Sequence, residues 1–142
     1  ALAAARAAQA QGAVVSVDLS SAALIREFGV AEFRARVAEL APDVALGNEQ
    51  EAEALGELPA PCWALKRGPA GCLVHGPAGG PRGTGPITEV DLPALPAEVV
   101  DTTGAGDAFA AGFLLGGTLE ERARRALATA ARCVATLGAM PA

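Results

Sequence analysis

The sequence contains little cysteine: three residues, at positions 62, 72 and 133, in a chain of 142. Because the number is odd and the spacings are wide, neither a disulfide framework nor a metal site of closely spaced cysteines is indicated. Cysteines without such a role behave as small apolar side chains and are usually buried. We therefore expect Cys62, Cys72 and Cys133 to lie in the core of a protein of the reducing cytoplasm.

Long apolar runs and clusters of positive charge are also missing. Charged residues such as Arg6, Asp18, Lys66 and Asp107 interrupt every apolar stretch before it reaches the roughly 18 residues that a membrane-spanning helix needs. The net charge is −5, and the basic residues are scattered singly or in pairs, so no basic patch is indicated. We therefore expect neither a membrane nor a nucleic acid among the partners.

The sequence does not begin with methionine, and its only methionine is Met140. Residues 1–11 have the pattern of a helix that stops at Gly12, so the chain begins inside an element rather than before one. We expect further sequence upstream. The 142 residues, 51% of them hydrophobic, are nevertheless enough for one packed domain.

Strand and helix patterns alternate along the chain. A β-branched run over 13–19 predicts a strand buried on both faces, and short strands are expected within 42–47, 62–77 and 89–101, the last ending at Asp101. Helices are expected over 20–28, 30–40, 48–56 and after Gly104, with a final helix from a capping box at Thr118 to Gly138. Residues 76–86 are rich in glycine and proline and predict a surface loop. Alternating strands and helices predict an α/β fold with a mostly parallel sheet.

The stretch DTTGAGDAF, residues 101–109, places an acid at the start of a predicted helix, after two glycines. Glycines at such a turn let backbone N–H groups approach an anion, but a phosphate-binding P-loop would carry a lysine where this turn has Asp107. An acid beside a phosphate is useful if it accepts the proton of an attacking hydroxyl while the N–H groups stabilise the transferring phosphoryl group. That is the chemistry of a kinase acting on an alcohol. The alternative is that Asp107 only complements the helix dipole.

The nonapeptide DTTGAGDAF resembles the signature of the ribokinase-like, or pfkB, family of carbohydrate kinases. Further stretches at 15–29, 42–56, 65–74 and 135–142 are similar to the second half of family members, in the same order. The resemblance covers nearly all of this chain but only about half of a full member. It implies a ribokinase-like fold in which residues 1–142 are the C-terminal nucleotide-binding part, and in which the N-terminal sugar-binding half and the lid are absent from this chain.

The same resemblance assigns roles around the glycine turn. Asp107 would be the catalytic base, and the anion hole would be formed by Gly104, Ala105 and Gly106. Asp101 and Thr103 match positions that hold an activating monovalent cation, such as K⁺, in many members. Without the resemblance, Asp101 reads as a turn residue and Thr103 as a helix cap.

A second group of residues would bind the nucleotide. Asn48 and Glu51 match the Asn-x-x-Glu element that helps to organise magnesium and phosphate, although the same spacing also predicts an N-cap with its capping-box partner. Lys66, the only lysine, and Gly68 match the segment that approaches the nucleotide phosphates. Gly71 belongs to that segment, where it also suits the turn between two strands.

The resemblance implies ATP and Mg²⁺ as cofactors, a small sugar or a nucleoside as the substrate, and a homodimer as a compatible assembly. The leading interpretation is an ATP-dependent kinase acting on a hydroxyl of a sugar or sugar-like alcohol. The alternatives are a nucleoside kinase of the same fold and a nucleotide-binding module without turnover. The residues of this chain do not distinguish among the acceptors.

Overall fold

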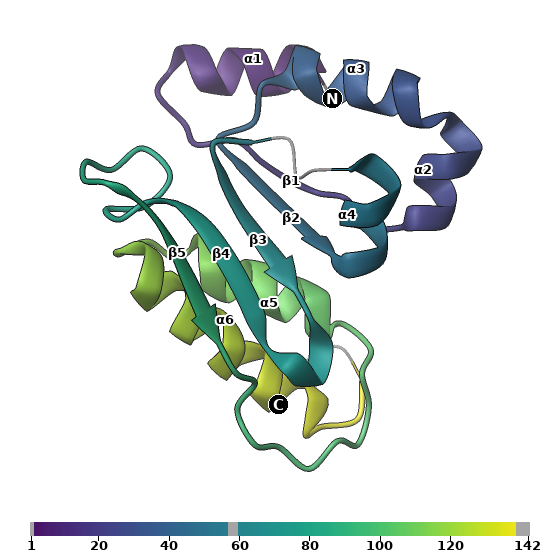
Figure 1. Cartoon of the computed structure of the whole chain (residues 1–142), viewed down its shortest axis with the longest axis vertical. Coiled ribbons are helices and arrows are strands. Elements are labelled where there is room, and N and C mark those ends of the chain that lie inside the picture. Colours follow the sequence, from purple (N-terminus) through teal and green to yellow (C-terminus); the bar gives the residue numbers. More distant parts are fainter. Residues whose placement is uncertain (1, 57–59, 139–142) are drawn as a thin grey trace.

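The computed structural model describes residues 2–56 and 60–138, which form layers around a five-stranded sheet (Figure 1). The strands lie side by side in chain order: β1 (Ser16–Asp18), β2 (Val44–Asn48), β3 (Cys62–Lys66), β4 (Cys72–Pro77) and β5 (Ile87–Leu92). The first three pair in parallel, whereas β4 is antiparallel to both of its neighbours. Four of the five strands therefore run in one direction, as the predicted α/β fold requires.

Two helices, α5 (Ala105–Leu114) and α6 (Leu119–Val134), cover one face of the sheet (Figure 1). The main core lies between them and the alternate residues of β2, β3 and β4 that point toward this face, among them Val44, Ala64 and Val74. Phe113 of α5 is fully buried there. This packing positions the N-terminus of α5 relative to the strand ends.

The remaining helices gather near the β1 end of the sheet (Figure 1). They are α1 (Leu2–Ala10), α2 (Ala22–Phe28), α3 (Val30–Leu40) and α4 (Glu49–Leu55), and a 3₁₀ turn, η1 (Gly68–Ala70), joins β3 to β4. A second, smaller cluster of buried apolar residues, Leu19, Ile25 and Leu55, holds α2 and α4 to the chain after β1. The predicted helix boundaries at Gly12, Gly29 and Gly56 are confirmed.

The predicted strand leading into Asp101 is wrong. After β5 the chain is irregular from residue 93 to residue 102, and Pro93 and Pro96 interrupt any ladder there. The N–H groups of Val100 and Asp101 donate to the carbonyl of Val134, at 2.8 and 3.2 Å, rather than to a strand. The glycine turn is therefore entered from a loop that is anchored to the end of α6.

Two further boundaries differ from the expectations. The last helix ends at Val134 and not at Gly138, since the Val134 carbonyl is taken by the loop before α5; Leu137, expected on the buried face, is 84% exposed. The first strand is only three residues long and half-exposed, because β1 lies at the edge of the sheet among the described residues. Its three residues are exposed or only partly buried, so the expected burial on both faces is not observed in the described part of the chain.

The three cysteines are buried, as expected. Burial raises the pKa of the Cys62 and Cys72 thiols to about 11, so both stay protonated at neutral pH. Across residues 2–56 and 60–138, no helix has the length and apolar character needed to cross a membrane.

Candidate active site

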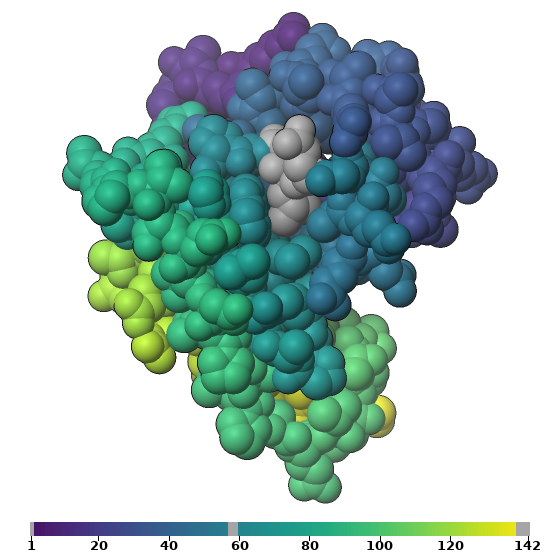
Figure 2. All heavy atoms as spheres, viewed as in Figure 1, coloured from purple at the N-terminus to yellow at the C-terminus, as the bar shows by residue number. Residues whose placement is uncertain are grey.

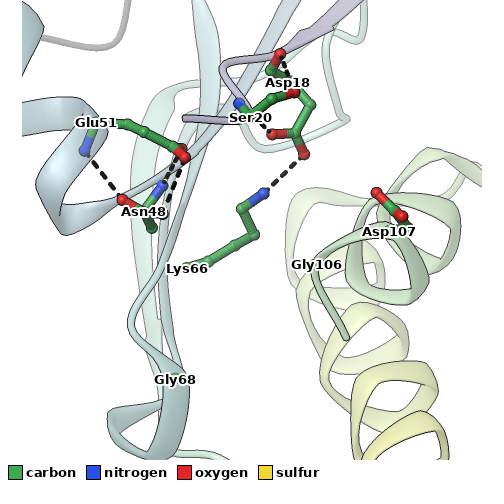
Figure 3. Close-up of a pocket in the computed structure, with 8 residues that line it drawn as sticks. All are labelled: Asp18, Ser20, Asn48, Glu51, Lys66, Gly68, Gly106 and Asp107. Atoms are coloured by element: carbon green, nitrogen blue, oxygen red, sulfur yellow. Dashed lines mark hydrogen bonds and ion pairs between the residues drawn. The ribbon is translucent and has the colours of Figure 1, made fainter. Parts of the chain in front are cut away.

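Three polar side chains meet where the parallel strands end. Asp18, Asn48 and Lys66 are the last residues of β1, β2 and β3, and parallel strands bring their carboxyl ends to one edge of the sheet. The first turn of α5 lies opposite them. Between them is a pocket of about 330 Å³, seen as an indentation on the right of Figure 2 and drawn in Figure 3. Its lining residues are Asp18, Ser20, Asn48, Glu51, Lys66, Gly68, Gly106 and Asp107.

The pocket contains six of the eleven residues that the sequence assigned to a site: Asn48, Glu51, Lys66, Gly68, Gly106 and Asp107. They come from three separate stretches of the chain. Lys66 does not behave as a surface lysine, because its side chain is 17% exposed and its Nζ lies 2.7 Å from Asp18 Oδ2. A Cβ atom placed on Gly106 would lie 3.6 Å from the same Nζ, so the ammonium stands in front of the helix N-terminus.

The glycine turn leaves backbone donors free at the start of α5. Gly104, with φ at +76°, is in the left-handed conformation that favours glycine, and it caps the helix without a side chain. The N–H of Ala105 donates to Thr102 at 3.2 Å. The N–H groups of Gly106 and Asp107 have no acceptor within the described part of the chain. Two donors at the positive end of a helix therefore remain available to an anion.

Asp107 is exposed, and its carboxylate makes no hydrogen bond or ion pair with any residue in 2–56 or 60–138. It is the third residue of α5, a position at which α4 and α6 also carry an acid. In those two helices the acid, Glu51 or Glu121, closes a capping box. Asp107 does not, because Gly104 offers no side chain for a reciprocal cap. Its carboxylate faces the same space as the ion pair of Lys66 (Figure 3).

Asn48 and Glu51 form the predicted capping box. Glu51 is only 2% exposed, and its carboxylate accepts from the Asn48 backbone N–H at 2.8 Å and from Asn48 Nδ2 at 2.9 Å. Asn48 Oδ1 in turn accepts from the Glu51 N–H at 2.9 Å. The pair holds the junction of β2 and α4 at the floor of the pocket. The predicted N-cap with its capping-box partner is therefore confirmed.

Among the described residues, no three acidic, histidine or cysteine side chains lie close enough to hold a metal ion by themselves. Mg²⁺ in phosphoryl-transfer sites is bound largely by substrate phosphates and water, with only one or two carboxylates. The pocket has acids and backbone donors but no closed metal cage, which fits an ion brought in by a phosphate ligand.

Five of the predicted site residues lie outside the lining of the pocket. Gly104 and Ala105 adjoin it as the cap and first residue of α5, whereas Asp101 and Thr103 precede the turn. Gly71 is buried in the turn after η1, with φ at +93°, where a Cβ would collide with the backbone of residues 92–94. The turn itself therefore requires glycine at this position, and a contact of Gly71 with the nucleotide stays a prediction.

The carboxylate of Asp101 already has two backbone donors. Oδ1 accepts from the Thr103 N–H at 2.9 Å and Oδ2 from the Gly138 N–H at 3.0 Å. These hydrogen bonds, with that from Thr103 foremost, hold the pKa of Asp101 below its ordinary value. The expected cation site would share these atoms. The resemblance to the family also implies that Ala142 stands in the place of a hydroxyl found in some members, and this residue lies outside the described part of the chain.

Two lining residues, Asp18 and Ser20, were not predicted as site residues. The sequence did carry a signal for Asp18, since an acid that closes a parallel strand faces the ligand-binding edge of the sheet. Ser20 has φ at +63°, and its N–H donates to Asp18 Oδ1 at 3.1 Å. That conformation belongs to the turn into α2, and no sequence pattern around Ser20 predicts it.

A sequence model described as pfkB family carbohydrate kinase matches residues 1–142. The ribokinase of Arabidopsis thaliana is 47% identical over 64 residues, which are 42% of this chain and 16% of that protein. Among solved structures, the probable sugar kinase of Rhizobium etli is 25% identical, with a TM-score of 0.82 over 99% of this chain and 44% of that one. The ribokinase-like fold is thereby confirmed.

Two similar structures are named for nucleoside or riboside substrates. The adenosine kinase of Sinorhizobium meliloti is 28% identical, with a TM-score of 0.80, and the match covers 98% of this chain and 45% of that one. The aminoimidazole riboside kinase of Salmonella enterica is 27% identical, with a TM-score of 0.73, over 98% of this chain and 52% of that one. The chain thus spans about half the length of the solved structures that it matches.

Proposed function

We propose that this chain, which belongs to the pfkB family of carbohydrate kinases, supplies the nucleotide site and the catalytic base of an ATP-dependent kinase. The acceptor would be a hydroxyl of a small sugar or sugar-like alcohol. The observation that carries the proposal is that, among the described residues, the carboxylate of Asp107 and the N–H groups beside it at the α5 N-terminus have no partner. The corresponding acids of α4 and α6 close capping boxes, whereas Asp107 does not.

Each residue of the pocket has a chemical role in this proposal. Asp107 accepts the proton of the acceptor hydroxyl, while the backbone from Gly104 to Gly106 stabilises the charge on the transferring phosphoryl group. Lys66 binds the phosphates as a point charge. Mg²⁺ bound to ATP would neutralise part of the phosphate charge. A K⁺ ion at Asp101 and Thr103 stays a prediction.

The acceptor would be held by residues outside this chain. Among the described residues, the pocket is lined by the strand ends, the turns that follow them and the first turns of α4 and α5, and the chain spans about half the length of its structural relatives. We propose that residues 1–142 are the C-terminal nucleotide-binding part of a cytoplasmic enzyme and that a sugar-binding half completes it. A nucleoside is the second candidate acceptor, because an adenosine kinase and an aminoimidazole riboside kinase are among the similar structures.

The variant Asp107→Asn tests the proposal in a protein that contains this chain and the sugar-binding half. If Asp107 is the base, kcat falls by about 10²–10⁴-fold while ATP affinity is nearly unchanged, because the amide keeps the shape of the side chain but accepts no proton. ADP release across a panel of sugars and nucleosides gives kcat, and calorimetry gives ATP affinity.

The matched control is Glu120→Gln, which removes an exposed acid from the first turn of α6, away from the pocket. Its kcat should equal that of the unmodified protein. An Asp107→Asn variant that kept most of its kcat would remove Asp107 from the chemistry. ATP binding without phosphorylation of any compound in the panel would identify a nucleotide-binding module instead.

A further inference from the structure

The pocket contains an ion pair between residues of two strands that do not touch. Asp18 ends β1 and Lys66 ends β3, with β2 between them. Their side chains reach across the end of β2 to a distance of 2.7 Å and are 26% and 17% exposed. An ion pair so far withdrawn from water is less screened than one on the surface.

The Asp18 carboxylate is held from its other side. Its Oδ1 accepts from the Ser20 N–H at 3.1 Å, and the Ser20 hydroxyl donates to the Asp18 carbonyl at 3.3 Å. The chain then turns directly into α2, whose N-cap is Ser21. One oxygen is thus fixed by the turn, and the other is presented to Lys66 (Figure 3).

Among the described residues, Lys66 is the one cation that lines the pocket, together with three carboxylates. Both oxygens of Glu51 already accept from Asn48. Asp107 has no partner within the described ranges and follows Gly106, whose Cβ position is 3.6 Å from Lys66 Nζ. Without Asp18, the long and flexible lysine side chain would therefore find its next carboxylate in Asp107.

We propose that Asp18 is a positioning residue that holds the Lys66 ammonium in front of the α5 N-terminus and keeps it from pairing with Asp107. The inference rests on the proposed function, in which Lys66 binds phosphate and Asp107 must stay free to accept a proton. An ammonium placed in advance loses less side-chain freedom when a phosphate binds. An Asp107 carboxylate that is not paired with the ammonium remains free to accept the hydrogen bond of the acceptor hydroxyl.

The single lysine of the chain makes this arrangement measurable. In the 142-residue chain labelled with ¹⁵N-lysine, NMR shows one side-chain ammonium signal, that of Lys66. Asp18→Asn removes the charge but leaves an amide oxygen for the Ser20 N–H, so the turn is preserved. We expect this variant to shift the Lys66 signal, and Asp107→Asn alone to leave it in place. In the double variant the signal should move further, to its position in the urea-unfolded chain.

The control is Asp91→Asn. Asp91 forms an ion pair with Arg67, the residue that follows Lys66, so this variant removes a nearby carboxylate that is not a partner of Lys66 and should not shift its signal. An unmoved signal in Asp18→Asn, or a shift in Asp107→Asn alone, would overturn the proposal. If Asp18→Asn does not fold, Asp18→Glu replaces it: its displaced signal should be insensitive to Asp107→Asn, and sensitivity would count against the proposal.

Tripolyphosphate separates this inference from the function on which it rests. Added to the unmodified chain, it should shift both the Lys66 ammonium signal and the Gly106 amide signal. If neither moves, the phosphate site fails, and the positioning role fails with it. If both move but the Asp18→Asn result is negative, the phosphate site stands and only the role of Asp18 is overturned.

Discussion

At the scale of single residues, the glycine at the N-cap of α5, Gly104, determines whether Asp107 takes part in a capping box. Glu51, Glu121 and Asp107 occupy the same position in the first turn of three helices. A polar N-cap side chain bonds to each of the two glutamates, whereas the N-cap of α5, Gly104, has no side chain that could bond to Asp107. Within residues 2–56 and 60–138, the Asp107 carboxylate and the N–H groups of Gly106 and Asp107 therefore have no partner, which is what the proposed function requires of them.

A substitution at Gly106 tests whether the N–H groups at the start of α5 bind an anion, because a side chain there would not enter the core. Outside its own turn of helix, a Cβ at this position would meet only Lys66 Nζ within 4 Å among the described residues, so Gly106→Val should fold. The branched side chain would stand in front of the free N–H groups, and ATP affinity should fall by about tenfold or more, a loss of about 1.4 kcal/mol or more. Calorimetry measures the binding, and circular dichroism the fold.

The matched control is Gly112→Ala in the same helix. There a Cβ would lie 2.9 Å from the backbone of Ala126 and Arg125, so the packing of α5 on α6 must shift. We expect the free energy of unfolding to fall by about 1–3 kcal/mol with ATP affinity retained in the folded protein. Unaltered ATP binding by Gly106→Val would mean that the glycine turn has only a structural role.

At the scale of elements, the glycine-rich loop is tied to the edge of the sheet opposite the pocket. Arg82 donates to both oxygens of Asp43, at 2.6 and 2.8 Å, and to the Gly12 carbonyl at 2.8 Å. Asp43 Oδ2 also accepts from the Val15 N–H at 2.8 Å. Asp43 therefore links the loop after β4 with the starts of β1 and β2.

The pKa of Asp43 makes this link sensitive to acid. Burial raises the pKa, but the hydrogen bonds from Arg82 and Val15 outweigh burial and lower it below 3.8. A carboxyl whose folded pKa is lowered stabilises the fold above its unfolded pKa, and this contribution is lost as the pH falls through the folded pKa. The stabilisation should thus be complete at neutral pH and decline below about pH 4.

Asp43→Asn should lower the free energy of unfolding at pH 7 by about 1–3 kcal/mol, because the charged hydrogen bonds are lost. The difference from the unmodified chain should shrink as the pH falls below about 4. Urea unfolding at a series of pH values measures both effects. A loss of the same size at every pH would show that the charge of Asp43 is not what stabilises the link.

At the scale of the whole molecule, the β1 edge is the least complete part of the structure. β1 is three residues long and, within the described part of the chain, has a neighbouring strand on one side only. Beside it, Leu24 and Phe28 of α2 are 62% and 56% exposed and line an apolar groove. Open strand edges and exposed apolar side chains pair readily with other chains.

We therefore expect the 142-residue chain by itself to associate and to phosphorylate no sugar. Catalysis needs the acceptor hydroxyl held within hydrogen-bond reach of Asp107, and a misplacement of about 1 Å can cost about 10²-fold. Size-exclusion chromatography should give a mass above the 14.1 kDa of the monomer, and ADP release should be absent across a panel of sugars and nucleosides. A monomer with a turnover of about 1 per second or faster would contradict this expectation.

The sequence by itself determined the elements whose signals are local. Capping boxes at Asn48 and Thr118 and a helix boundary at Gly29 were predictable, because these features depend on residues within one turn of each other. The motif from Asp101 to Phe109 likewise identified the glycine turn and the acid beside it. The family and the α/β class followed from the same local patterns.

Only the tertiary structure decided which residues meet. The expected strand before Asp101 failed because the N–H groups of Val100 and Asp101 found the end of α6, 34 and 33 residues further along the chain. The pairing of Lys66 with Asp18 joins positions 48 residues apart, and no local pattern encodes it. The pair forms because parallel strands bring their carboxyl ends to one edge of the sheet, so that charged residues far apart in the sequence lie close enough to form an ion pair.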